Sequence, residues 1–372
     1  MRHKEVTLTI PAEAQEKERR VRDALARLNY DSLIITRRDN FAWLTCGGRA
    51  VVACTVPDSP VLLVLTPKRK YAVGYSMDLP RTMDEEIGGL GYEPVSLPTF
   101  GKTPAEVALE LADGRAAADG RLYGAADIGD TIASLWEPYT PEEMERYAGV
   151  CRESGQILRQ LADWVEPGMT ERYVAAHMWQ LYLERNFEGC CMFVGSDERI
   201  KRYRHAVPSE KPIEKAVLLS PAASKYGLYV PNSRIVYFGE PPDDIRRRFQ
   251  AVATMQAAIT ASTRPSVPLY ALYELCMKLF ETLGYPEERT RHYHGGPTGY
   301  KPSMPERCQD RNARVQANTA FAWYFTITGV KNEETALVDA HGATIQTLDP
   351  SWPRLEIEYE GRKIAVADIM VK

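Results

Sequence analysis

The fold is decided by the stretch AVLLSPAASKYGLYVPNSRIVYFG, residues 216–239. It begins with the apolar run VLL at residues 217–219 and ends in a second apolar run, IVYF, at residues 235–238. Between them, residues 224–227 combine serine, lysine, tyrosine and glycine, a composition typical of a tight turn. Two β-prone runs joined by such a turn predict a β-hairpin.

Two further segments follow the hairpin. The stretch RHYHGGPTGYKPS, residues 291–303, carries His292 and His294, which alternate and would share one face of a strand. An apolar run at residues 319–327 predicts a strong strand, and a turn leads from it into a second strand at residues 331–338. The hairpin and these strands together indicate an antiparallel sheet.

Four segments in this order resemble the creatinase, prolidase and aminopeptidase P family: residues 205–208, the hairpin with its closing Ser233 and Arg234, residues 294–299, and residues 331–335. The resemblance extends from about Glu16 to about Ile345. It implies an α/β (α+β) chain with the pita-bread fold. Residues 1–138 would form a creatinase-like N-terminal α/β domain. Residues 139–372 would form the C-terminal pita-bread domain, a curved antiparallel sheet covered by helices.

Peptidases of this family hold two divalent metal ions with two Asp, one His and two Glu, and this chain departs from that pattern. Ser220 and Pro231 stand at the two Asp positions, and Gly296 stands at the His position. The first Glu position falls near residues 327–329, so Glu333 is the only carboxylate in register. Hydroxyl, proline and glycine do not hold a hard cation as carboxylates do. We therefore expect neither a metal nor another cofactor.

The resemblance also assigns the proton-transfer group. His205 matches the family histidine that contacts the reacting group, and an imidazole both accepts and donates a proton near neutral pH. Glu333 and His294 would orient substrate or water beside it. Two alternatives stay open: His205 forms only a local hydrogen bond, or His292, His294 and Glu333 together hold a single metal ion.

Without the acidic ligands, basic and polar side chains dominate the expected pocket. Guanidinium and ammonium groups bind carboxylates and phosphates, so the pocket favours an anionic substrate. The residues expected to bind it are Arg204, Tyr229, Arg234, His292, Tyr300 and Lys331.

Creatinase, within the same family, hydrolyses a C–N bond without a metal. By this resemblance we expect a metal-independent hydrolase or lyase that acts on a C–N bond of a small, carboxylate-bearing metabolite, with His205 as general acid and base. One alternative is a catalytically inactive pita-bread protein that binds a partner. The other is a metal-dependent Xaa-Pro dipeptidase or aminopeptidase with altered ligands.

The composition is that of a two-domain enzyme. The chain has 372 residues, too many for one compact core, and a formal net charge of -4, which argues against a nucleic-acid partner. No run of about eighteen apolar residues is present to span a membrane. Seven cysteines in so long a chain indicate reduced thiols and a cytoplasmic location. The expected partner is a small-molecule substrate. The resemblance implies a homodimer in which the N-terminal domain of one subunit lies near the active site of the other.

Local signals mark the remaining elements. Thr140, Pro141 and Glu143 combine an N-cap, a proline in the first turn and a glutamate three residues after the cap, which predicts a long helix over residues 141–165. Helical segments are also expected at residues 12–28, 68–75, 104–112, 171–185, 245–263 and 269–283. Strands are expected at residues 32–36, 51–54, 61–65, 122–124 and 192–194, with a C-terminal hairpin over residues 355–366.

Overall fold

A computed structural model describes residues 10–372 of the chain. The chain forms two compact units, one ending at Glu137 and the other beginning at Pro138. This division lies next to the boundary expected between residues 138 and 139. Both units combine helices with sheets, so the fold belongs to the predicted α/β (α+β) class.

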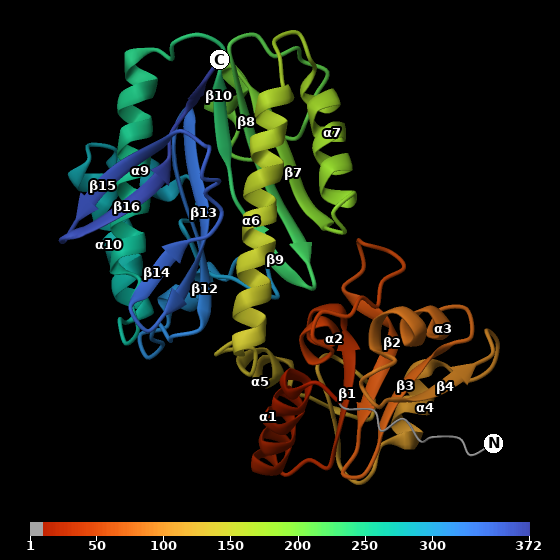
Figure 1. The fold of residues 1–372 in the computed structure, drawn as a ribbon. Helices are drawn as coiled ribbons and strands as arrows, with labels where there is room; N and C mark the ends of the chain where they lie inside the picture. Colours follow the sequence, from red (N-terminus) through yellow and green to blue (C-terminus); the bar gives the residue numbers. More distant parts are fainter. Residues whose placement is uncertain (1–9) are drawn as a thin grey trace, which may run out of the picture. The chain divides into compact units, whose positions relative to one another are not determined.

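The N-terminal unit is built on a six-stranded mixed sheet in the order β4-β3-β2-β1-β5-β6 (Figure 1). Its strands are β1 (Ser32–Arg37), β2 (Asp58–Leu65), β3 (Lys70–Tyr75), β4 (Glu93–Leu97), β5 (Ala116–Ala118) and β6 (Ala126–Asp127). Its helices are α1 (Ala12–Leu28), α2 (Arg38–Leu44), α3 (Leu79–Arg81), the π-helix η1 (Thr82–Ile87), α4 (Pro104–Leu111) and α5 (Gly129–Ser134). Ile34, Val64 and Val73 of the sheet share a buried cluster with Ala108 of α4.

Three sequence-based expectations for this unit are wrong. Residues 70–75 form strand β3 rather than a helix, because they pair along β2, with Val73 opposite Leu62. Residues 51–54 and 122–124 form no strand. A short β-prone run becomes a strand only where a neighbouring strand pairs with it, and neither segment has such a partner.

The C-terminal unit contains two sheets. The first has the order β17-β10-β8-β7, and β9 pairs with β8. Its strands are β7 (Glu188–Ser196), β8 (Ala216–Lys225), β9 (Leu228–Pro231), β10 (Arg234–Tyr237) and β17 (Met370–Val371). The second has the order β11-β12-β13-β14, with β11 (Gly295–Pro297), β12 (Thr319–Ile327), β13 (Val330–Asp339) and β14 (Gly342–Ile345). The two sheets are joined where the Ser233 backbone N–H donates to the Glu333 carbonyl oxygen at 3.0 Å.

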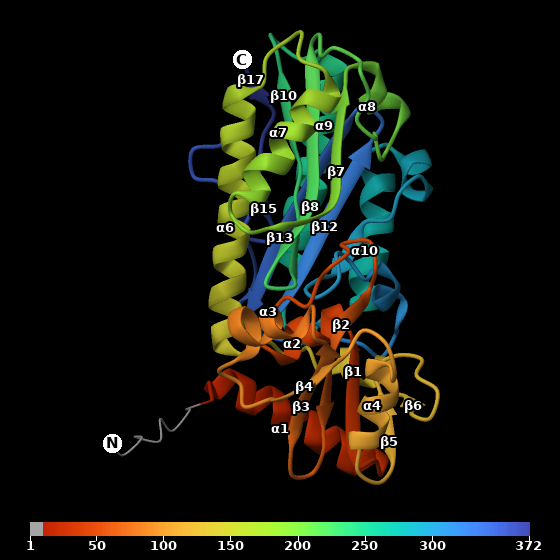
Figure 2. The same cartoon turned by 90° about the vertical axis from the view of Figure 1, so that its right-hand side faces the viewer.

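Helices cover these two sheets (Figures 1 and 2). Helix α7 (Glu171–Leu183) packs on β7, and α6 (Pro141–Trp164) packs on β9 and β13. Helix α9 (Asp243–Ser262) packs on β12, β13 and β14, and α10 (Leu269–Thr282) packs on α9. The unit also contains α8 (Glu198–Arg202), the 3-10 helices η2 (Pro286–Thr290) and η3 (Pro305–Gln309), and the hairpin β15 (Arg354–Tyr359) and β16 (Arg362–Ala367). Among residues 10–372, no helix is both long enough and apolar enough to cross a membrane.

Most local signals in this unit have the predicted outcome. Helix α6 begins at Pro141 because Thr140 Oγ1 accepts a hydrogen bond from the Glu143 backbone N–H while the Glu143 side chain accepts one from the Thr140 N–H. The hairpin turns at Tyr226 and Gly227, whose φ values of 59° and 76° are those of a two-residue hairpin turn. The strands at residues 319–327 and 330–339 and the C-terminal hairpin are also confirmed.

Candidate active site

A cavity of about 460 Å³ lies in the C-terminal unit beside the junction of the two sheets. It brings together four residues that the sequence singled out: His205, His292, Lys331 and Glu333. Ser220 and Pro231, from the hairpin, also line it. The cavity is therefore the candidate active site.

An ion pair with a hydroxyl partner occupies one wall. Lys331 and Glu333 lie two residues apart on β13, so their side chains leave the same face of the strand. Lys331 Nζ is 2.9 Å from Glu333 Oε2 and donates a 2.8 Å hydrogen bond to Ser220 Oγ on β8. The Ser220 hydroxyl donates to the same Glu333 oxygen at 3.3 Å. Because the Lys331 and Glu333 side chains are only 5% and 8% exposed, the charges are held largely out of water.

Tyr324 stands directly opposite Glu333 in the register of β12 and β13, and it lines the same cavity. The Lys331 ammonium lies 5.6 Å from the centre of its ring, within the range of a cation–π interaction. Burial raises the pKa of the Tyr324 phenol, so the hydroxyl stays protonated at neutral pH. Ile327, near which the sequence placed the family's first glutamate, is buried in the hydrophobic core instead.

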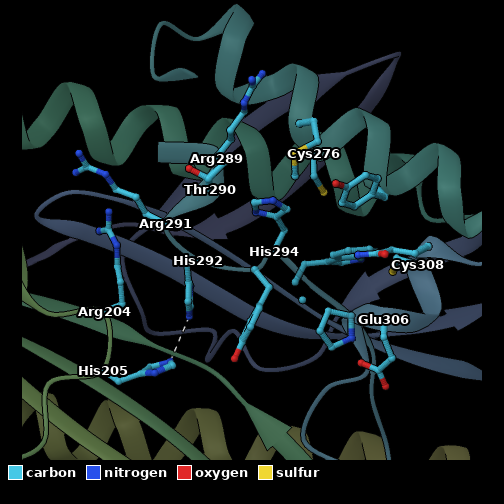
Figure 3. A pocket seen from close by; sticks show the side chains of 17 residues that line it. Arg204, His205, Cys276, Arg289, Thr290, Arg291, His292, His294, Glu306 and Cys308 are labelled. Atoms are coloured by element: carbon cyan, nitrogen blue, oxygen red, sulfur yellow. Dashed lines mark hydrogen bonds between the residues drawn. The ribbon is translucent and has the colours of Figure 1, made fainter. Parts of the chain in front are cut away.

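Two histidines meet at another wall of the cavity. The Nε2 atoms of His205 and His292 are 3.2 Å apart, and Figure 3 shows the two rings turned toward each other. The His205 ring also stacks on Phe193, with ring centres 4.8 Å apart. The pKa of His292 is lowered to about 2 by burial and by the charge of Lys331, and the pKa of the more exposed His205 is lowered by partial desolvation and by the same charge. Both imidazoles are therefore neutral at neutral pH, so one ring nitrogen donates to the other.

His294 does not line this cavity. Its side chain is buried next to Phe280 and Phe325, with ring centres 5.2 Å and 6.1 Å away, and burial lowers its pKa to about 4. His292 and His294 do not share a strand face as the sequence predicted, because β11 begins only at Gly295. His294 therefore does not line the cavity that holds Glu333; it lines an adjoining cavity together with His205 and His292.

Three of the predicted substrate-binding residues lie elsewhere. Arg234 is buried in a bidentate ion pair with Glu334, at 3.0 Å and 3.2 Å, and Glu334 leaves β13 on the face opposite to Glu333. The Tyr300 hydroxyl donates to a buried Glu143 oxygen at 2.6 Å. Tyr229 pairs through its backbone N–H with a carbonyl in the 291–303 segment at 2.8 Å, and its side chain is not in the cavity wall.

Arg204 lines a second cavity of about 720 Å³ that adjoins the first (Figure 3). The two cavities share a wall that includes His205, His292 and Tyr293. Arg204 is ion-paired with Glu288, and it directly precedes His205 in the sequence.

The donor set of the cavity does not fit a dinuclear metal centre. Ser220 and Pro231 line it, and Lys331 places an ammonium among them. At Gly296 an added Cβ would lie 3.0 Å from Cys308 Sγ and 3.2 Å from the Met304 carbonyl oxygen, so a histidine there would require its neighbours to shift. Among residues 10–372, no group of three or more His, Cys, Asp and Glu side chains is placed to hold a metal ion. His292, His294 and Glu333 accordingly do not form such a group.

Comparisons with known proteins give a family and a fold. The model of metallopeptidase family M24 matches residues 145–343, more than half of the chain. No match was found among curated proteins.

Several solved structures share the fold of the whole chain. The Xaa-Pro dipeptidase from Bacillus anthracis has a TM-score of 0.76 at 16% identity, covering 96% of this chain and 100% of that one. The dipeptidase PepE from Mycobacterium ulcerans has a TM-score of 0.74 at 18% identity, covering 97% and 98%. The prolidase from Pyrococcus horikoshii OT3 has a TM-score of 0.74 at 16% identity, covering 90% and 98%. These similarities support the predicted N-terminal domain followed by a pita-bread domain.

Proposed function

Because the chain belongs to metallopeptidase family M24, we propose that it is a hydrolase that cleaves a C–N bond of a small, carboxylate-bearing substrate, and that it does so without a metal ion. One observation carries the proposal. The Lys331 ammonium is held between Ser220 Oγ at 2.8 Å and Glu333 Oε2 at 2.9 Å in the wall of the cavity. The Lys331 ammonium occupies the place beside the one carboxylate in register, where it repels a metal cation, and its charge is balanced by Glu333 while its N–H groups remain donors for an anionic oxygen.

Lys331 supplies the electrostatic part of the reaction. Hydrolysis of an amide passes through a tetrahedral intermediate with a negatively charged oxygen, and a prepositioned donor in a water-poor site contributes about 3 kcal/mol to stabilising it. Glu333 and Ser220 fix the ammonium by charge and hydrogen bond. Glu333 thus acts as a positioning residue for Lys331, whereas the sequence alone suggested that it orients substrate or water.

Proton transfer is assigned to His205. Its neutral imidazole takes a proton from water as the water oxygen bonds to the carbonyl carbon, and it returns that proton to the nitrogen as the C–N bond breaks. One water is consumed, and an acid and an amine are released. His292, 3.2 Å away, exchanges a hydrogen bond with His205 and so sets which ring nitrogen of His205 carries the proton.

A second candidate is a protein that binds a small anion or a peptide without turning it over. The observation in its favour is that Lys331, Glu333 and Ser220 already satisfy one another by hydrogen bonds. In such a site, polar groups other than these three bind the ligand, and no bond of the ligand is broken.

A metal-dependent dipeptidase with altered ligands is the third candidate, and the donor set opposes it. It needs at least three ligands around one ion, and the ammonium of Lys331 stands 2.9 Å from the one carboxylate that matches the family pattern.

The test combines metal analysis with a substrate screen. The purified full chain is analysed by inductively coupled plasma mass spectrometry, and amine release is followed over a panel of N-acyl amino acids, ureido acids and Xaa-Pro dipeptides, with and without EDTA. We expect far less than one metal per chain and turnover that EDTA does not change. Stoichiometric metal, or activity that appears only when Mn²⁺, Co²⁺ or Zn²⁺ is added, would contradict the proposal. Turnover in the wild type that persists in His205→Gln would contradict the assignment of His205.

A further inference from the structure

The second cavity has the lining of a binding site for an apolar body. Its volume is about 720 Å³, and it opens on the wall that carries His205 and His292. Part of its apolar lining comes from α10 and β12, namely Tyr273, Cys276, Met277 and Trp323. A cavity of this size and composition is typical of sites that enclose most of a small ligand.

One end of this cavity carries two arginines that converge on a single hydroxyl. Arg204 Nη2 lies 3.3 Å from Thr328 Oγ1, and Arg291 Nη1 lies 3.2 Å from the same oxygen. Figure 3 shows both guanidinium groups on the same side of the cavity. Two like charges this close are stable only with an anion between or beside them.

Within residues 10–372, the carboxylate that pairs with both arginines is that of Glu288. Glu288, which is 4% exposed, is ion-paired with Arg204 and lies 3.5 Å from Arg291 Nη1. Burial opposes ionisation of the Glu288 carboxyl, but the hydrogen bond from the Thr328 hydroxyl and the charge of Arg204 together lower its pKa, so Glu288 is ionised at neutral pH. Two guanidinium charges against one carboxylate leave one net positive charge at this end.

The other charged groups of the lining do not cancel that charge. Arg289 is ion-paired with Glu281 on the exposed surface, so it adds no net charge. Glu306 is the acidic residue of the lining, and Figure 3 shows it on the side of the cavity opposite to Arg204 and Arg291.

We propose that the second cavity binds a monocarboxylate with an aromatic or branched apolar body, with the carboxylate on Arg204 and Arg291 and the body against Tyr273, Met277 and Trp323. A single net positive charge matches a carboxylate, which carries one negative charge at neutral pH, better than a phosphate monoester, which carries about two. The proposal rests on the proposed function in one respect: the bound molecule is the part of the substrate next to the C–N bond, because the cavity shares the wall of His205 and His292.

The test measures binding and needs no turnover. Isothermal titration calorimetry on the full chain compares 4-phenylbutyrate with its neutral isostere 4-phenylbutanamide, neither of which the proposed reaction requires. We expect the wild type to bind the carboxylate about fivefold or more tightly than the amide at low salt, and the preference to shrink at high salt. Failure of the hydrolase proposal leaves this result unchanged, and failure of this binding leaves the metal analysis and the amine-release screen unchanged.

Three variants make the result specific. Arg291→Gln, at a side chain that is 54% exposed, should abolish the preference. Glu288→Gln should increase the preference for the carboxylate, because it removes the competing negative charge. In the wild type, Thr328 Oγ1 donates a 2.6 Å hydrogen bond to Glu288 Oε1, and the glutamine amide oxygen can accept the same bond. Arg289→Gln is the matched control, because it removes the same charge from the same lining but not from Thr328, and should keep the preference. No preference in the wild type, or an equal loss in Arg289→Gln and Arg291→Gln, would overturn the proposal.

Discussion

The Lys331 ammonium and the Glu333 carboxylate face each other at 2.9 Å inside the cavity, because two residues along one strand return the side chain to the same face. Each group stabilises the charge of the other where little water is present. Removing one of them therefore leaves a buried charge without its partner.

This pairing predicts an asymmetry between single and double variants. Lys331→Met should lower the free energy of unfolding by about 3 kcal/mol, and Lys331→Met/Glu333→Gln should recover much of that loss, because the double variant buries no unpaired charge. Urea unfolding measures both. Additive losses in the double variant would contradict a direct pairing.

On a substrate that the wild type turns over, Lys331→Met should lower kcat by about a hundredfold.

Arg234 should behave as a structural residue. Arg234→Met leaves Glu334, whose side chain is 0% exposed, without its bidentate partner and should cost about 3–5 kcal/mol of unfolding free energy. The matched control is Arg159→Gln on α6, whose pair with Asp163 is at the surface and should cost less than about 0.5 kcal/mol. A stable Arg234→Met variant with a raised KM would instead indicate a role in substrate binding.

Buried histidine makes the fold sensitive to acid. His294 has a pKa of about 4 in the folded chain, against 6.5 when it is free, so the unfolded chain takes up a proton over a range in which the folded chain does not. Stability should therefore fall as the pH drops from about 6.5 to about 4, with His294 contributing about 3 kcal/mol of the change.

The variant His294→Leu should reduce the slope of that pH dependence, because it removes the titrating group beside Phe280 and Phe325, and the part due to His292 and His205 should remain. His341→Gln, which removes an exposed imidazole, is the control and should keep the wild-type slope. Chemical unfolding at several pH values measures the slopes. Equal slopes in wild type and His294→Leu would contradict this assignment.

Gly296 should not accept a side chain. Its Cβ would lie 3.0 Å from Cys308 Sγ and 3.2 Å from the Met304 carbonyl oxygen, so Gly296→Ala should destabilise the fold by about 1–3 kcal/mol. Gly89→Ala is the control, because nothing lies within 4 Å of its Cβ, and it should change stability by less than about 0.5 kcal/mol. Thermal unfolding compares the two. A stable Gly296→Ala would show that the segment yields, and that a ligand histidine could be restored there.

The sequence predicted the fold class and the residues of the hairpin face. His205 and Glu333 were found because they match family positions, and Lys331 because it is a basic residue two positions before Glu333; the structure brings all three to one cavity. The face occupied by Glu333 also determines that its neighbour Glu334 points to the other face. Once the structure pairs Ser233 with Glu333, the same alternation places the Arg234 side chain away from the cavity.

Other features depend on contacts that a single sequence does not contain. Tyr324 faces the cavity because β12 and β13 pair with Tyr324 opposite Glu333, a register set by the turn at their end. His292 and His294 do not share a strand face because β11 begins only after them. The His294 side chain is buried beside Phe280, outside the cavity that holds Glu333. Arg204, Arg291 and Thr328 come from three separate segments of the chain, so no local sequence pattern predicts that they meet.

The hydrogen bond that fastens one sheet to the other runs from the Ser233 N–H to the Glu333 carbonyl oxygen and uses no side-chain atom. The sheet junction does not depend on the side chain at position 333, because every residue there supplies the same backbone carbonyl oxygen. Proline is the exception, since it would distort the backbone of the strand. Libraries randomised at positions 220, 331 and 333 would thus keep this backbone hydrogen bond, while variants that leave Lys331 or Glu333 without its partner lose stability.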